Sequence, residues 1–164
     1  MIAEDVMRRV IGFSAWSGTG KTTLMTRIIR ILKERGLTVA VVKHDVHGID
    51  ACEEGKDSGR FRKAGADSVA LIGPDASSDP EAGLNDALEH LSGADIILVE
   101  GFKHARIPRV GLRRMAADRP LPEAPETYIA VVTDVPLEAG VPQFRWDEYP
   151  ELTDFLILYL FSTP

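Results

Sequence analysis

A nine-residue stretch near the start of the chain has the residue types and spacing that bind phosphate. It consists of Ala15, Trp16, Ser17, Gly18, Thr19, Gly20, Lys21, Thr22 and Thr23. Glycine lets a backbone approach phosphate oxygens, lysine supplies a mobile positive charge, and the hydroxyl that follows it can ligate Mg²⁺. The usual pattern begins with glycine where this chain has Ala15, and alanine fits there only with a negative φ. We interpret the stretch as a phosphate-binding loop (P-loop) and all nine residues as nucleotide-binding candidates.

Such a loop must lie between a strand and a helix. The apolar run at 10–13 predicts a strand over 10–14. Apolar residues at 24, 28, 31 and 32 have helical spacing and predict a helix from the loop to about Arg35. The N-terminus of this helix carries a positive partial charge, which favours a bound phosphate.

The rest of the chain alternates strands with helices. Buried strands are predicted at about 38–43 and 127–132, further strands at 68–72 and 95–101, and helices at about 58–64, 80–91 and 151–161. Alternating residues predict an edge strand over 109–113, and a mobile loop is expected over 114–125. The alternation indicates an α/β fold with a doubly wound, mostly parallel sheet, like that of P-loop NTPases. We expect a single P-loop nucleotide-binding domain over residues 1–164.

Two acids follow predicted strands at the edge where such sheets bind ligands. Glu100 comes after four apolar strand residues and before Gly101, a Walker-B-like arrangement. A carboxylate there could hold Mg²⁺ and orient an attacking water, or it could only cap a turn. Asp45 could contact Mg²⁺ or the same water, or it could be a solvated loop acid. Glu100 and Asp45 are our catalytic candidates and, with Thr22, our metal-binding candidates.

Thr133 and Asp134 end another predicted buried strand. A buried carboxylate at Asp134 could accept hydrogen bonds from N1 and N2 of guanine, whereas the adenine edge differs. The alternative is an ordinary turn. We include both residues among the nucleotide-binding candidates.

Two polar segments allow more than one interpretation. His44, His47 and Cys52 are ligand types that suit zinc, but they lack a second paired set, so the segment can equally fold over a nucleotide or a partner. Seven basic residues crowd a later segment and could dock an anionic substrate or protein, or form a solvated rim. They are Lys103, His104, Arg106, Arg109, Arg113, Arg114 and Arg119.

Composition narrows the classes of partner. The chain has 164 residues, 45% of them hydrophobic, and a net charge of −6. An acidic balance argues against nucleic-acid binding. The one cysteine, Cys52, excludes an internal disulfide and favours a reducing compartment. No signal-like N-terminus or membrane-length apolar run is present, so we expect a cytoplasmic protein with no membrane partner.

The motifs, taken in order, resemble one known family. After the P-loop come Lys-His-Asp at 43–45, Gly-Lys-Asp-Ser at 55–58, Val-Glu-Gly-Phe-Lys at 99–103 and Thr-Asp-Val-Pro at 133–136. From Val10 to Pro136 the chain resembles the molybdopterin-guanine dinucleotide biosynthesis protein B (MobB) family. By matching position, Lys21 and Thr22 would be the phosphate and Mg²⁺ residues, and Glu100 the Walker-B-like acid.

The resemblance implies a GTP-binding protein with weak Mg²⁺-dependent GTPase activity, usually a homodimer. It also implies two kinds of partner: molybdopterin or its guanine dinucleotide form, and the molybdenum cofactor guanylyltransferase (MobA). Two alternatives stay open. One is a small-molecule kinase with Arg113, Arg114 and Arg119 in a lid, and the other is a metal-delivery GTPase that uses His44, His47 and Cys52.

Overall fold

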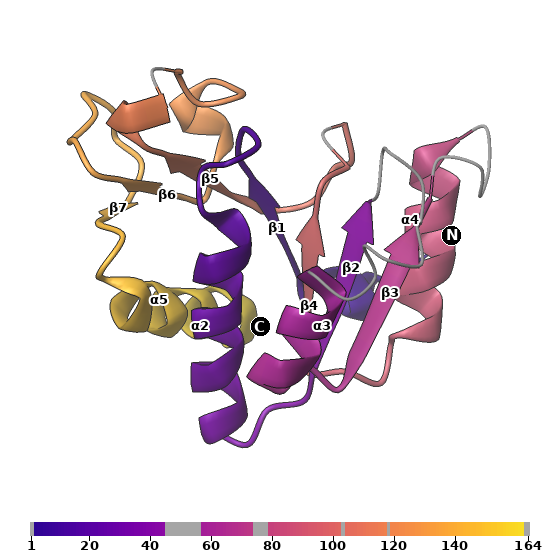
Figure 1. Cartoon of the computed structure of the whole chain (residues 1–164). Coiled ribbons are helices and arrows are strands. Elements are labelled where there is room, and N and C mark those ends of the chain that lie inside the picture. Colours follow the sequence, from indigo (N-terminus) through magenta and orange to yellow (C-terminus); the bar gives the residue numbers. More distant parts are fainter. Residues whose placement is uncertain (1, 45–56, 74–78, 103, 118, 163–164) are drawn as a thin grey trace.

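Seven parallel strands form one sheet in the described part of the computed structural model, which covers residues 2–44, 57–73, 79–102, 104–117 and 119–162 (Figure 1). The strands are β1 (Val10–Ser14), β2 (Val39–His44), β3 (Ser68–Ile72), β4 (Ile96–Glu100), β5 (Arg109–Arg113), β6 (Ala130–Thr133) and β7 (Gln143–Phe144). The helices are α1 (Glu4–Met7), α2 (Lys21–Glu34), α3 (Asp57–Ala64), α4 (Pro80–His90) and α5 (Tyr149–Phe161), with 3-10 turns η1 (Met115–Ala117) and η2 (Pro125–Thr127).

The order of the strands places the P-loop near the middle of the sheet. The order is β3-β2-β4-β1-β5-β6-β7, and every described pair runs parallel. Phe13 at the end of β1 pairs with Glu100 at the end of β4. Because all the strands point the same way, their carboxyl ends share one edge with the loop that precedes α2 (Figure 1).

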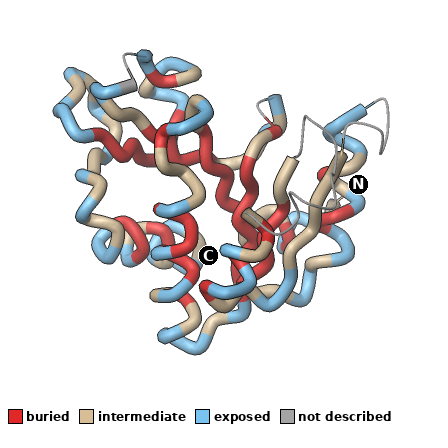
Figure 2. The backbone as a smooth tube through the Cα atoms, in the orientation of Figure 1, coloured by how far each residue is buried: buried red, intermediate tan, exposed pale blue. Residues whose placement is uncertain are grey.

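Helices cover both faces of the sheet, which confirms the doubly wound α/β prediction. On one face, α2, α3 and α5 pack against the strands through residues such as Ile28, Phe61 and Leu156. On the other face, α1 and α4 contribute Val6 and Leu88 to a second cluster. Strands β1 and β4 and most of β2 are buried on both faces, as expected for a parallel sheet, whereas β3 at the end of the sheet is exposed to half-buried. Figure 2 shows the buried strands as red segments inside exposed helix surfaces and loops.

The prediction of an edge strand over 109–113 is wrong. This strand, β5, lies between β1 and β6. Its alternating pattern suggested one exposed face, but Arg109 and Gly111 are both buried. At Gly111 the ring of Tyr128 takes the place of a side chain, and a Cβ there would lie 2.8 Å from that ring. Segment 114–125, expected to be a mobile loop, includes η1 and is joined to the P-loop by a 2.8 Å bond from Trp16 Nε1 to the Pro120 carbonyl.

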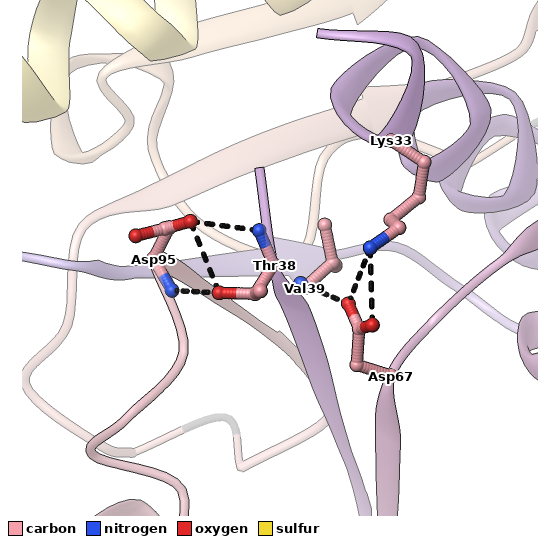
Figure 3. A network of polar contacts seen from close by, with 5 residues as sticks. All are labelled: Lys33, Thr38, Val39, Asp67 and Asp95. Atoms are coloured by element: carbon pink, nitrogen blue, oxygen red, sulfur yellow. Dashed lines mark hydrogen bonds and ion pairs between the residues drawn. The ribbon is translucent and has the colours of Figure 1, made fainter. Parts of the chain in front are cut away.

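Two aspartates, Asp67 and Asp95, lie where the strands begin, at the end of the sheet opposite the P-loop. Figure 3 shows their hydrogen bonds. Asp67 accepts from Lys33 Nζ at 2.8 Å and from the Val39 N–H at 2.8 Å. Asp95 accepts from the Thr38 N–H at 2.8 Å and from its hydroxyl at 3.0 Å. The hydrogen bond from Lys33 lowers the pKa of Asp67, and the Thr38 backbone bond lowers the pKa of Asp95. These contacts join the starts of β2, β3 and β4.

Candidate functional site

The P-loop leaves the start of helix α2 open to an anion. Gly20 is the N-cap of α2, with φ of 102°, and provides no side-chain cap. The first N–H groups of a helix lack partners within the helix, so a phosphate can accept from them. Phe102 is the single non-glycine residue with positive φ in the described ranges. Ala15 therefore has a negative φ, which alanine at this position of the loop requires. Thr19 is buried, and its hydroxyl donates to the Trp16 carbonyl at 2.6 Å, which closes the loop internally.

A cavity of about 1060 Å³ opens in front of this loop. It brings together eight of the nine P-loop candidates and Glu100, and leaves out Thr19. Its remaining described lining comes from the end of β2, the turn after β4, α3, the start of α4 and the segment after η1. Those residues are Lys43, His44, Asp57, Arg60, Asp79, Pro80, Glu81, Gly101, Phe102, His104, Ala105 and Arg119.

Glu100 carries the charge that faces the P-loop lysine. Its side chain is 9% exposed, and Oε1 lies 3.5 Å from Lys21 Nζ. Its other oxygen, Oε2, is buried without a hydrogen-bond partner in the described part of the chain. A buried polar atom without a partner requires an explanation, such as an ion or a water. Carboxylate and hydroxyl oxygens are the ligands that Mg²⁺ prefers, so Glu100 and Thr22 fit this ion.

The contacts of helix α3 with the site involve residues that the sequence interpretation did not include among the site candidates, although two of them, Lys43 and Asp57, lie in the family motifs. Arg60 donates to Thr23 Oγ1 at 2.9 Å and so joins α3 to the first turn of α2. Lys43, beside Glu100 in the sheet, forms an ion pair with Asp57 at the start of α3. The charged residues within 55–63 were a sign of these contacts in the sequence. The packing of α3 on α2 was needed to show which of them reach the P-loop.

The basic segment does not form one anion dock in the described residues. Arg109 is buried and donates to backbone carbonyls. Arg114 Nε donates to the Thr19 carbonyl at 2.8 Å, and its guanidinium stacks on Trp146 at 3.8 Å from the ring centroid. Lys103 lies outside the described residues. His104 and Arg106 are both exposed. His104 lines the cavity, whereas Arg106 lies outside its described lining.

Of the three arginines expected in a kinase lid, only Arg119 lines the large cavity. Its guanidinium lies 5.1 Å from the Trp16 ring centroid. Arg113 and Arg119 also line a smaller cavity of about 240 Å³ with Met115 and Pro120. Arg119 therefore lines both cavities.

Asp134 is exposed, so the expectation of a buried carboxylate is wrong. Its two oxygens accept from the Met115 N–H at 3.0 and 3.1 Å, and it lies outside the described lining of the large cavity. Thr133 is buried, and its hydroxyl donates to the Val135 carbonyl at 2.7 Å. Met115 places Asp134 beside the smaller cavity. Recognition of guanine by Asp134 stays a prediction.

Three of the candidate residues, Asp45, His47 and Cys52, lie outside the described residues. Within the described ranges, no group of three or more His, Cys, Asp or Glu residues is placed to hold a metal ion. In the same ranges, no helix has both the length and the apolar character that crossing a membrane requires.

Comparison with known proteins identifies the family. Residues 10–134 match the family model described as molybdopterin guanine dinucleotide synthesis protein B (MobB). Proteins named molybdopterin-guanine dinucleotide biosynthesis adapter protein from Haemophilus influenzae and Escherichia coli are each 35% identical. The matches cover 90% of this chain and 86% of the former protein, and 97% of both this chain and the latter.

Solved structures agree with this match. Bacillus subtilis MobB is 28% identical, with a TM-score of 0.63 over 94% of this chain and 99% of that one. HypB from Helicobacter pylori, solved in complex with nickel, has a TM-score of 0.64 over 94% of this chain and 87% of that one at 15% identity, which shows a shared fold alone. The chain belongs to the MobB family.

Proposed function

We propose that this protein is a GTP-binding adapter with weak GTPase activity that acts in molybdopterin guanine dinucleotide biosynthesis. Membership of the MobB family supports the role in that pathway. One observation carries the nucleotide part of the proposal. A buried carboxylate oxygen of Glu100 has no partner among the described residues, and Glu100 lines the same cavity as the P-loop.

Different residues of the loop are proposed to bind different groups of the nucleotide. The open N-terminus of α2 and the backbone at Gly18 and Gly20 take the phosphate oxygens. Lys21 supplies a charge to the outer phosphates, and its 3.5 Å approach to Glu100 keeps that charge beside the loop. A bound Mg²⁺, held by Thr22 and Glu100 together with Asp45, would neutralise charge on the triphosphate.

Glu100 is also proposed to act in hydrolysis. Glu100 can orient a water molecule and accept a hydrogen bond from it at Oε2, the oxygen that has no partner in the described residues. Asp45 is proposed to assist at the same position. Of the two arginines in the described lining of the cavity, Arg60 donates to Thr23 and Arg119 lies 5.1 Å from the Trp16 ring centroid. Because both guanidinium groups have these other contacts, slow hydrolysis is expected of this site.

The remaining parts of the proposal rest on the family. We propose that residues 1–164 form a single nucleotide-binding domain that works in the cytoplasm as a homodimer. Its proposed partners are molybdopterin or its guanine dinucleotide form and the guanylyltransferase MobA. The relatives in Haemophilus influenzae and Escherichia coli, which are named adapter proteins, support this role.

Titration calorimetry with GTP, with and without Mg²⁺, tests the nucleotide part. Wild-type protein should bind GTP, and Mg²⁺ should strengthen the binding. Lys21→Ala should weaken it, whereas Arg30→Ala, an exposed cation farther along the same helix, should not. Absence of GTP binding by the wild-type protein would overturn the nucleotide part. Size-exclusion chromatography of the protein alone and with MobA tests the two proposed assemblies.

A further inference from the structure

Gly12, in the middle of β1, leaves room for two side chains, those of Ile107 and Arg109. It pairs with Arg109, the first residue of β5. A Cβ at Gly12 would lie 3.2 Å from Arg109 Cγ and 2.9 Å from Ile107 Cδ1, which is closer than side chains normally approach. The glycine therefore lets the Arg109 side chain pass over β1 toward the end of β4.

The guanidinium of Arg109 ends in the turn that follows Glu100. It donates to the carbonyls of Gly101 at 3.2 Å and Ala105 at 3.1 Å, and also to the carbonyl of Phe102. Arg109 is 5% exposed, and among the described residues it forms no ion pair. Burial lowers the pKa of Arg109, but an arginine in a protein keeps its charge. Both terminal nitrogens of this buried cation thus hold backbone carbonyls.

The turn held in this way has an unfavourable backbone conformation. Gly101 has φ of 92° and Phe102 has φ of 57°. A phenylalanine with positive φ persists only where its surroundings hold it there. Arg109 provides part of that constraint, and the stacking of Phe102 on His44, at 4.6 Å between ring centroids, provides another part. Backbone strain of this kind is concentrated at functional sites.

We propose that Arg109 is a positioning residue that holds the turn after β4 so that Glu100 points toward Lys21 and the P-loop cavity. The turn begins at the residue after Glu100, so any relaxation of Gly101 and Phe102 moves the carboxylate directly. This inference rests on the proposed function, because Glu100 is the acid proposed to serve Mg²⁺ and the attacking water. Arg109 itself lines neither cavity in the described residues and acts through Glu100.

The test uses Arg109→Lys and a matched control. Lysine keeps the charge but loses the planar fork that can bond several carbonyls at once. The control is Arg9→Lys, because Arg9 also donates to two backbone carbonyls, those of Ser92 and Ala94, at 3.2 and 3.3 Å. Those carbonyls precede β4, at the opposite edge of the sheet. Arg109→Gln serves as a second variant if the lysine variant does not fold.

Two measurements are made on each variant: GTP affinity with and without Mg²⁺, and amide hydrogen exchange over 101–105. Arg109→Lys should reduce the strengthening by Mg²⁺ about tenfold, as loss of a group that orients a metal ligand does. Affinity without Mg²⁺ should change by less than about twofold, because the loop itself is intact. Exchange over 101–105 should become faster. Arg9→Lys should leave all three quantities unchanged.

If Arg109→Lys keeps the full strengthening by Mg²⁺, or if Arg9→Lys loses as much, Arg109 has only a structural role and the inference is overturned. If the wild-type protein shows no strengthening by Mg²⁺, the proposed function itself fails. In that case hydrogen exchange still tests whether Arg109 holds the turn after β4. Unchanged exchange over 101–105 in Arg109→Lys would overturn that claim as well.

Discussion

Replacing Lys21 with alanine should change both nucleotide binding and the stability of the empty protein. The side chain is 19% exposed at the mouth of the P-loop, where it can donate to a triphosphate. A hydrogen bond to a charged group contributes about 1.5–3 kcal/mol. GTP affinity should therefore fall about ten- to 150-fold.

The second effect follows from Glu100. With Lys21 removed, this buried carboxylate loses the cation 3.5 Å away, while its other oxygen already has no partner in the described residues. Leaving a buried acceptor unsatisfied costs about 1–3 kcal/mol. The nucleotide-free Lys21→Ala protein should be less stable than wild type by about that amount. Adding Glu100→Gln should recover part of the loss, since the amide carries no charge.

Calorimetric titration with GTP and urea unfolding without nucleotide measure the two effects. Arg30→Ala is the control, because it removes an exposed cation from the same helix. GTP affinity equal to that of wild type would refute the assignment of the P-loop. Equal stability of Lys21→Ala and wild type would refute the electrostatic link between Lys21 and Glu100.

Three further predictions concern other residues. Glu100→Gln should slow single-turnover GTP hydrolysis much more than it weakens GTP binding, and a wild-type rate would make Glu100 a turn residue only. If Asp134 contacts the base of bound GTP, GTP should bind more tightly than ATP and Asp134→Ala should remove most of that gap; if ATP displaces a fluorescent GTP analogue as well as GTP does, Asp134 serves only the Met115 N–H. Asp67 and Asp95 have lowered pKa values in the folded state, so their contribution to stability is fully present above the unfolded pKa of about 3.9 and is lost as pH falls through the folded values. Urea unfolding across acidic pH should show a shallower loss of stability in Asp67→Asn and Asp95→Asn than in wild type, and an identical slope would contradict this account.

Local patterns were sufficient for most of the fold. The strand over 68–72 has the predicted bounds, and α2 ends at Glu34, within a residue of the prediction. These elements follow from continuous apolar runs and helical spacing, which depend on residues near in sequence. Strand β7, only two residues long and half-buried, has no such pattern and was not predicted.

The sequence failed where a distant side chain decides the environment. Arg109 and Gly111 looked like exposed positions of an edge strand because neither is a large apolar residue. Arg109 is buried because carbonyls from the turn after β4 satisfy its donors, and Gly111 because the Tyr128 ring covers it. Asp134 looked like a buried strand-end acid, but it is exposed and bonds the Met115 N–H.

The sequence by itself determined the strand, loop and helix around residues 15–23, the alternation of strands with helices and the family. Each of these is carried by residues close together along the chain or by motifs in a fixed order. The tertiary structure alone decided that Glu100 lies beside Lys21, that Arg60 reaches Thr23, and that Arg109 crosses β1 at Gly12 to hold the turn after Glu100. These contacts join residues that are far apart in the chain. They depend on strand order, register and the room that a missing side chain leaves, and no local pattern specifies any of the three.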